Sequence, residues 1–395
     1  MDKKMYKYIG ILLGLILLLV IFIWLTNVFT GGNKLSYESL EKKLIDAAKD
    51  YAKDHSAIYP TEIGTSTVIS STVLINNNYI NEFSSYLNDT DVVCNGSVEI
   101  YMVEEDYYNF TTDFNCGNKY SNIKLYEKII ADNNYGIVEG SGLYEKVDGK
   151  FITDESELGS HDYNTLEYVF RGDEVNNFLK IDENLWRIVS INENGDMLLI
   201  YVGHVQKTSP WDDRYNETVK KNQGINIYEK DGIKSRAMEN ALKFYNGEVV
   251  LMDKEPYSEK TRYLTVPMSL CVGKRNQTDS DISGSIECQT ILENQYVGLL
   301  PAYYYMSASL DDSCNSIVSK NCGNYNYLSY FDDYWWLLTA NSENTNEAYN
   351  ISRKFAESTL CSSRSNIRPI IMLGSRAIYD SGDGTENNPY IVKYF

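Results

Sequence analysis

The sequence has few of the residues on which the common catalytic motifs depend. Among 395 residues there are only three histidines, His55, His161 and His204, and no His-x-x-x-His pair, so neither a zinc site nor a histidine-based triad is predicted. The chain also lacks a Gly-x-Ser-x-Gly motif and a glycine-rich phosphate loop that ends in lysine. Lysine and arginine total 36 against 55 aspartates and glutamates, a net charge of −19. This acidity argues against a nucleic-acid partner, which requires a basic face.

Phenylalanine is scarce beside tyrosine, with 12 residues against 34. Long stretches rich in Asn, Lys, Ile and Tyr indicate that codon bias explains part of this excess. An exposed cluster of tyrosines in a binding domain would give the remainder a function.

Charge is absent from Tyr8 to Asn33, and residues 8–29 form an almost unbroken apolar run. About 20 such residues span the hydrocarbon core of a bilayer as a helix. The sequence therefore predicts an uncleaved, single-pass helix in the plasma membrane, with residues 1–7 as a cytoplasmic tail and the rest extracytoplasmic. A cleaved secretory signal is the alternative, but no small-x-small cleavage site follows the run.

Cysteine is absent from the apolar run, and the seven cysteines include no Cys-x-x-Cys pair. Six of them fall into neighbouring pairs: Cys94 and Cys116, Cys271 and Cys288, Cys314 and Cys322. This arrangement predicts disulfides, and hence a location outside the cytosol. Cys361 is left over, and the five cysteines after Cys116 permit several pairings, among which the sequential one is preferred. Seven reduced cysteines in a cytosol-facing protein is the alternative.

The first pair also has a geometric basis. Residues 98–103 and 107–114 have the composition of two strands, joined by the acidic turn 104–106. In a hairpin centred on residue 105, Cys94 and Cys116 face each other, and facing residues of neighbouring strands lie close enough for a disulfide.

Residues 34–120 are predicted to form a small membrane-proximal α+β module. Ser36 has the position of an N-cap, and apolar residues spaced by three and four from Tyr37 to Tyr51 predict an amphipathic helix that ends near His55. A second apolar stretch, residues 68–80, precedes the hairpin. A core this small gains most from a disulfide.

Residues 161–395 are predicted to form a larger antiparallel α+β domain, reached through a polar connection at 121–160 that contains a hairpin around Asp148 and Gly149. An amphipathic pattern predicts a helix over residues 233–245, with Gly247 as its stop. Short apolar runs bounded by turn residues predict strands. These strands are 168–171, 177–181, 186–191, 197–201, 335–339, 349–355 and 367–373.

Several motifs of this region resemble N-terminally anchored surface proteins of low-GC Gram-positive bacteria. They include Tyr168-Val-Phe-Arg-Gly-Asp-Glu-Val-Asn-Asn177, Leu185-Trp-Arg-Ile-Val189, Trp335-Trp-Leu-Leu-Thr339 and Ile367-Arg-Pro-Ile-Ile371. A strand bearing Trp-Leu-Leu-Thr, a variable loop and then Arg-Pro-Ile-Ile resembles the C-terminal half of C-type-lectin-like domains, a fold shared with formylglycine-generating enzymes. The likeness covers roughly residues 141–395. It implies a fold rather than a chemistry, because its motifs are structural.

The chain departs from the sugar-binding C-type lectins at the motifs that hold calcium and sugar. Glu255-Pro256-Tyr257 lacks the amide at its third position, and Trp211-Asp212 lies far upstream of the expected place. The resemblance therefore does not imply calcium-dependent sugar binding. Nor does it imply formylglycine chemistry, for which no pair of catalytic cysteines is identified.

One group of candidate ligand contacts joins an aromatic face to hydrogen-bonding groups, a combination suited to a sugar or peptide. It consists of Trp211, Asp212, Asp213 and Arg214. The alternative is a tryptophan that fills the core while Arg214 pairs with the carboxylates.

Two further groups are weaker candidates. Trp335 and Trp336 are adjacent on a predicted strand, so one of them is expected to face outward and contact a ligand. Asp380, Asp383 and Glu386 offer oxygen ligands that a Ca²⁺ loop could use, although the full Asp-x-Asp-x-Asp-Gly pattern is missing. A polar turn before the last strand is the alternative, and no other cofactor is expected.

These observations favour a non-catalytic, membrane-anchored extracytoplasmic binding or adhesion protein that recognises a surface polymer, glycan or protein. An extracytoplasmic enzyme on the formylglycine-generating-enzyme-like fold is one alternative. A pilin-like assembly subunit is another, because an apolar helix leads into an amphipathic helix and a sheet. Gly31 and Gly32 between those two helices count against the last alternative.

Overall fold

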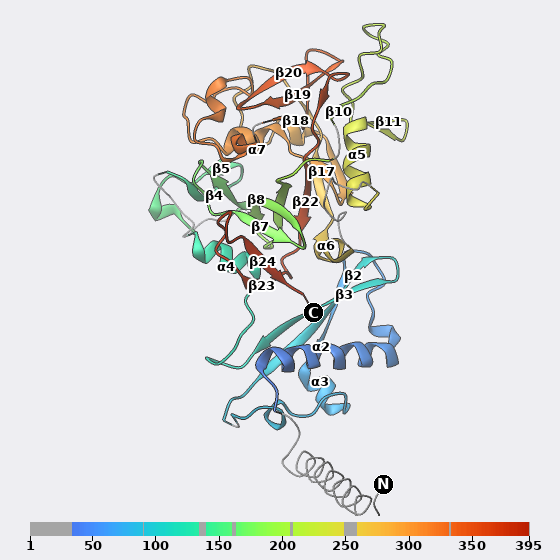
Figure 1. The fold of residues 1–395 in the computed structure, drawn as a ribbon, viewed down its shortest axis with the longest axis vertical. Coiled ribbons are helices and arrows are strands. Elements are labelled where there is room, and N and C mark those ends of the chain that lie inside the picture. The colour runs from blue at the N-terminus through green and yellow to red at the C-terminus, as the bar shows by residue number, and fades with distance from the viewer. Residues whose placement is uncertain are drawn as a thin grey trace, which may run out of the picture. The chain divides into compact units, whose positions relative to one another are not determined.

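The computed structural model of the protein describes residues 34–89, 91–133, 140–159, 163–205, 208–248, 259–331 and 333–394. The tail and membrane-spanning helix predicted for residues 1–29 lie outside these ranges. Among the described residues, no helix is both long enough and apolar enough to cross a membrane. The chain divides into two compact units (Figure 1): the first runs to residue 102 and includes 110–122, and the second comprises 103–109 and 123–394.

Helix α2 (Tyr37–Asp54) opens the first unit and confirms the predicted amphipathic helix. Ser36 is its N-cap: the side-chain oxygen accepts a hydrogen bond of 3.2 Å from the amide of Ser39, which satisfies one of the free N–H groups of the first turn. Leu40, Leu44 and Ala48 are fully buried along one face.

The sheet of the first unit has the strand order β1-β2-β3. Its elements are β1 (Ser66–Ser70), helix α3 (Ser71–Asn76), β2 (Asn95–Glu104) and β3 (Tyr107–Asn115). Strands β2 and β3 form the predicted hairpin, and a disulfide joins Cys94 to Cys116 at its open end, with 4.1 Å between their Cα atoms. The geometric prediction of this bond is confirmed.

A buried carboxylate connects helix α2 to the hairpin of the first unit. Glu41 is inaccessible to solvent and accepts hydrogen bonds from the hydroxyl of Thr112, from the hydroxyl of Tyr120 at 2.6 Å and from the amide of Asn122 at 2.9 Å. Burying a carboxylate is costly unless its oxygens are hydrogen-bonded. These three donors supply that compensation.

The second unit is built on a large sheet of eleven described strands. Its main path runs β13-β22-β9-β8-β6-β4-β5; β17 pairs with β22, β7 connects β8 to β24, and β23 pairs with β24. Among the described strands of this sheet, β7 and β24 pair in parallel and the others pair antiparallel. The strands are β4 (Gly142–Val147), β5 (Lys150–Phe151), β6 (Leu166–Arg171), β7 (Phe178–Ile181), β8 (Asn184–Asn192), β9 (Met197–Tyr201), β13 (Thr265–Val266), β17 (Gly298–Leu299), β22 (Pro369–Leu373), β23 (Ile378–Ser381) and β24 (Tyr390–Lys393).

Smaller sheets and helices complete the second unit. One sheet has the order β15-β18-β19-β20, and the pairs β10 with β21, β11 with β12 and β14 with β16 stand apart from it. Their bounds are β10 (Ser209–Pro210), β11 (Glu229–Lys230), β12 (Ile233–Lys234), β14 (Met268–Cys271), β15 (Lys274–Arg275), β16 (Ile291–Gln295), β18 (Tyr334–Asn341), β19 (Glu347–Ser352), β20 (Phe355–Leu360) and β21 (Arg364–Ser365). The helices are α4 (Leu125–Asp132), α5 (Arg236–Tyr245), α6 (Glu259–Leu264) and α7 (Ala302–Ser307). In Figure 1, α5 lies beside β10 and β17, and α7 lies against β18.

The fold is thus mixed α+β with mostly strands, as predicted, but three elements differ from expectation. Strands β4 and β5 form the predicted hairpin around Asp148 and Gly149, but the connection predicted at 121–160 also contains helix α4 and belongs from residue 123 to the second unit. The predicted strand 349–355 is two strands, since Arg353 and Lys354 form the turn between β19 and β20. Helix α5 begins later than predicted, because Ser235 caps it.

The remaining cysteines pair in the preferred sequential way. Disulfides join Cys271 to Cys288 and Cys314 to Cys322. Cys361 is a free, fully buried thiol.

Candidate ligand-binding site

The segment around Trp211, which was predicted to contact a ligand, instead makes contacts inside the protein that stabilise its own loop. Trp211 is buried, and its Nε1 donates a hydrogen bond of 3.0 Å to the carbonyl of Leu337. The buried carboxylate of Asp212 accepts hydrogen bonds from the amides of Arg214 (2.9 Å) and Ile225 (3.1 Å), and from Arg214 Nε at 2.7 Å. Trp211 therefore fills the core and Asp212 pairs with Arg214, as in the alternative to a ligand contact.

The more exposed members of this segment are also engaged within the protein. Asp213 Oδ1 accepts a hydrogen bond of 3.0 Å from Arg236 Nε, and Arg214 Nη1 donates one of 3.0 Å to the carbonyl of Ile233. Hydrogen bonds to Glu239 and Asp213 raise the pKa of the Arg236 guanidinium. The segment thus stabilises the start of helix α5.

Trp335 and Trp336 are both fully buried, so the expectation that one of them faces outward is wrong. Strand β18 lies between β15 and β19 in its sheet, and all of its residues after Tyr334 are buried. Alternation along a strand exposes every second residue only where one face of the sheet meets water. Here both faces are covered, and Trp336 Nε1 donates a hydrogen bond of 2.8 Å to the carbonyl of Ser209.

Two acidic residues of the terminal turn, Asp383 and Glu386, are hydrogen-bonded within the protein. Asp383 Oδ1 accepts from the amide and hydroxyl of Thr385 at 3.1 and 2.8 Å, and these contacts lower its pKa. Glu386 Oε1 accepts a hydrogen bond of 2.6 Å from the hydroxyl of Tyr330. Within the described ranges, Asp380, Asp383 and Glu386 are not part of any cluster of acidic, histidine or cysteine side chains that could hold a metal.

A polar cavity of about 820 Å³ lies in the second unit, and none of the sequence-predicted candidate residues lines it. Strand β8, the segment after β6, the loop at residues 309–330 and the turn between β19 and β20 contribute to its walls. Its size is that of a typical small-ligand pocket. Its charged and exposed aromatic side chains are Asp173, Arg187, Asp311, Tyr325, Tyr330 and Lys354.

The loop at residues 309–330 forms most of the wall and is closed on itself by the disulfide between Cys314 and Cys322. Buried Asn326 fixes its course: the amide nitrogen donates hydrogen bonds of 2.8 and 2.7 Å to the carbonyls of Tyr305 and Cys322. Its amide oxygen accepts one of 2.9 Å from the backbone of Leu328. The disulfide and the hydrogen bonds of Asn326 therefore restrict the conformation of the loop that forms this wall.

Gly323 allows this loop to pass against the turn between β19 and β20. A Cβ at position 323 would lie 1.9 Å from the carbonyl oxygen of Lys354, which is far closer than van der Waals contact permits. The hydroxyl of Tyr305 donates a hydrogen bond of 2.7 Å to the same carbonyl. This close approach places the exposed Lys354 beside the pocket.

Arg187 is the innermost charged residue of the pocket, with 3% of its surface exposed. Its Nε donates a hydrogen bond of 2.7 Å to Asn177 Oδ1. The guanidinium lies over the rings of Phe178 and Tyr327, 4.2 and 4.8 Å from their centroids. Burial lowers its pKa to about 10, so the side chain remains cationic at neutral pH.

The mouth of the pocket carries exposed tyrosines and an ionised carboxylate. Tyr325 and Tyr330 are 61% and 50% exposed. Asp311 accepts hydrogen bonds from the side chain of Asn324 at 2.7 Å and the amide of Ser313 at 2.8 Å, and both lower its pKa. Exposed rings beside hydrogen-bonding groups are suited to sugars and peptides.

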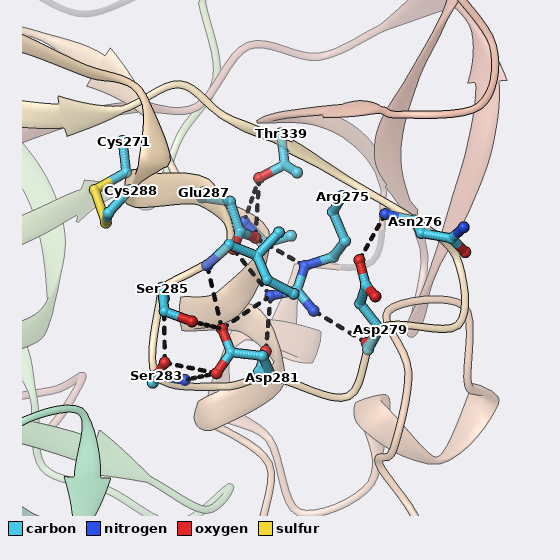
Figure 2. Close-up of polar contacts among 12 residues, drawn as sticks. Cys271, Arg275, Asn276, Asp279, Asp281, Ser283, Ser285, Glu287, Cys288 and Thr339 are labelled. Atoms are coloured by element: carbon cyan, nitrogen blue, oxygen red, sulfur yellow. Dashed lines mark hydrogen bonds and ion pairs between the residues drawn. A yellow bond between two sulfur atoms is a disulfide. The ribbon is translucent and has the colours of Figure 1, made fainter.

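Another charged cluster of the second unit is closed to ligands (Figure 2). In the loop between the second pair of disulfide-bonded cysteines, Arg275 and Glu287 are both inaccessible and form two parallel hydrogen bonds of 2.9 Å. The carbonyls of Asp279 and Asp281 accept further hydrogen bonds from Arg275 at 3.0 and 2.7 Å. Complete burial makes this cluster the core of the loop.

The residues of the pocket were not among the predicted contacts, although one signal pointed to them. Arg187 is a charged residue in the otherwise apolar strand Leu185-Trp-Arg-Ile-Val189, and such a residue is rarely buried without a specific role. Comparison of the chain with protein-family models, curated proteins and solved structures gives no match. The nature of the ligand is therefore inferred from the geometry of the pocket.

Proposed function

We propose that the chain is a membrane-anchored, extracytoplasmic binding protein that recognises a surface glycan, polymer or protein. The pocket beside strand β8 is the observation that supports this function, because it combines exposed tyrosines, an ionised carboxylate and a buried arginine in about 820 Å³. The apolar run at residues 8–29 and the three disulfides support the extracytoplasmic placement, since disulfides persist in oxidising compartments.

We further propose that the second unit is a C-type-lectin-like domain. The mixed architecture of mostly strands is compatible with this class, and the two motifs that carry the resemblance fall in strand β18 and at the start of β22. Long surface loops on such a scaffold are suited to carry a binding site. The pocket is formed mainly by one of these loops.

The state of Cys361 favours binding over catalysis. The enzyme alternative requires a reactive cysteine, and reactive thiols have a lowered pKa in partly exposed, electropositive surroundings. Cys361 is fully buried, and burial, together with the nearby carboxylates of Asp212 and Glu347, raises its pKa. We propose that this thiol serves packing.

Binding assays on the full chain in detergent micelles test the proposed function. Wild-type protein is applied to arrays of surface glycans, cell-wall polymers and candidate proteins, with and without Ca²⁺. The Tyr325→Ala variant should lose at least about fivefold in retention, because a stacked ring contributes on the order of 1 kcal/mol. The matched control is Tyr215→Ala, which removes a tyrosine that is 49% exposed outside the pocket. Retention that is absent, or equal for Tyr325→Ala and wild type, would contradict the proposal.

A further inference from the structure

Three of the buried arginines of the second unit differ in how their charge is balanced. Arg275 pairs with Glu287, and Arg368 pairs with Asp333 at 2.7 Å. Arg187 is buried to the same degree, yet no acidic side chain of the described ranges forms an ion pair with it. Of these three arginines, Arg187 is the one that lines the pocket.

The hydrogen bonds of Arg187 leave part of its guanidinium unused. Nε contacts Asn177 Oδ1 at 2.7 Å, while Nη1 and Nη2 each make one long contact, 3.3 Å to the carbonyl of Tyr327 and 3.4 Å to that of Val175. A guanidinium has five N–H donors, so two are not engaged in these contacts. All three acceptors are neutral. A buried cation without a counter-ion favours the arrival of an anion.

The shape of these donors selects the type of anion. The planar fork of an arginine binds a carboxylate through two parallel hydrogen bonds. Glu386 acts on Arg187 electrostatically without an ion pair, and its carboxylate is already hydrogen-bonded to Tyr330. The exposed Lys354 adds a second positive charge beside the pocket.

The remaining groups of the pocket suit the hydroxyls and the ring of a sugar. Asp173 and Asp311 present carboxylate oxygens, which accept hydrogen bonds from hydroxyl groups. From the described residues, the Asp173 carboxylate accepts one hydrogen bond, of 3.2 Å from the hydroxyl of Ser141, so acceptor capacity remains. Tyr325, 61% exposed, offers a ring face on which a sugar ring can stack.

We propose that the ligand of this pocket is an acidic saccharide whose carboxylate binds Arg187. Its ring lies on Tyr325, its hydroxyls donate to Asp173 and Asp311, and Lys354 attracts it to the mouth. This inference rests on the proposed function of the pocket and specifies its ligand class.

Calorimetric titration of the full chain in detergent micelles provides the test. The probes are oligosaccharides of glucuronic acid, of galacturonic acid and terminated by N-acetylneuraminic acid, each compared with its carboxyl-reduced form. At least one acidic probe should bind at least about tenfold more tightly than its reduced form, since a hydrogen-bonded charge pair has that effect.

Two variants test whether the carboxylate of the ligand binds at Arg187. Arg187→Lys retains the charge but loses the planar fork, and it should weaken the acidic probe at least about fivefold while the reduced form is unaffected. Lys354→Gln should weaken the acidic probe by a smaller factor that disappears in high salt. Lys230→Gln is its matched control, because Lys230 is exposed on β11 outside the pocket. If Arg187→Lys fails to fold, the comparison of acidic with reduced probes and the Lys354→Gln variant still test whether the pocket binds a carboxylate.

Equal affinity for the acidic and reduced forms overturns the inference, as does failure of every acidic probe to bind. The proposed function survives both results if retention on the arrays still depends on Tyr325. Loss of that dependence would overturn the proposed function itself.

Discussion

Single buried charges in this protein are balanced in different ways. Neutral donors surround the carboxylate of Glu41, whereas Arg275 has a carboxylate and two carbonyls as partners. Among the described residues, the direct partners of Arg187 are neutral hydrogen-bond acceptors and aromatic rings. Substitutions at these positions should therefore have distinct consequences.

Removing one partner of the Arg275 pair should destabilise the second unit strongly. The Arg275→Met variant leaves the carboxylate of Glu287 buried and unpaired, so we expect a loss of about 3–5 kcal/mol in the free energy of unfolding. Denaturant titration followed by tryptophan fluorescence measures it. The double variant Arg275→Met/Glu287→Leu is the control and should lose clearly less than the single variant. A single variant as stable as wild type would contradict the role given to the pair.

The free thiol should be unreactive in the native protein. Cys361 is fully buried and its pKa is raised by burial, and the thiolate is the reacting form. We expect an aromatic disulfide reagent at pH 8 to leave the folded chain unmodified and to detect one thiol per chain in concentrated guanidinium without reductant. Fast labelling of the native protein, or three thiols after unfolding, would contradict the structure.

The loop at residues 309–330, which forms most of the pocket wall, should stabilise the folded protein less at acidic pH than at neutral pH. Hydrogen bonds from Asn324 and Ser313 lower the pKa of Asp311 below its unfolded value near 3.9. A depressed pKa gives stabilisation that is present above about pH 4 and is lost as the pH falls through the folded value. The difference in Tm between wild type and Asp311→Asn should therefore shrink from pH 6 to pH 2.5. A difference in Tm that is the same at pH 6 and at pH 2.5 would contradict this role of Asp311.

Among the helices, strands and disulfides, those determined by residues close together in the sequence could be predicted. Helix α2 follows from a cap at Ser36 and a periodic apolar stripe, and the disulfide between Cys94 and Cys116 follows from the symmetry of a hairpin. The burial of Trp336 could not be predicted, because it depends on what covers the second face of strand β18.

The candidate site escaped prediction for a related reason. Its side chains come from segments far apart in the chain, at Asp173, Arg187, residues 311–330 and Lys354. Their convergence depends on sheet order and on the close approach that Gly323 permits. None of these is a local property of the sequence.

The hairpin disulfide should stabilise the first unit specifically. Cys94 and Cys116 are separated by 22 residues, and closing a loop of that size contributes about 3 kcal/mol through the unfolded state. The variant Cys94→Ser/Cys116→Ser should lower the Tm of a transition seen by circular dichroism. Tryptophan fluorescence is the control, because every tryptophan in the described ranges lies in the second unit. An equal shift in fluorescence would contradict a local effect.

For the whole molecule, charge governs solubility more than fold. The net charge is −19 at pH 7 and the isoelectric point is about 4.7. Because like charges keep copies of a protein apart, we expect solubility to be lowest near pH 4.7. Light scattering of the full chain in a neutral detergent between pH 4 and 8 measures this. A minimum above pH 6 would show that an apolar surface, rather than charge, controls association.

The loop around Arg275 is organised around a positive charge that belongs to the chain itself. Its carbonyl and carboxylate oxygens converge on one positive centre, as the oxygens of a calcium loop do. Here the centre is a guanidinium bonded to the chain itself. A chelator cannot remove this guanidinium, and dilution cannot dissociate it from the loop. We therefore expect the order of this loop to persist when metal ions are removed from the medium.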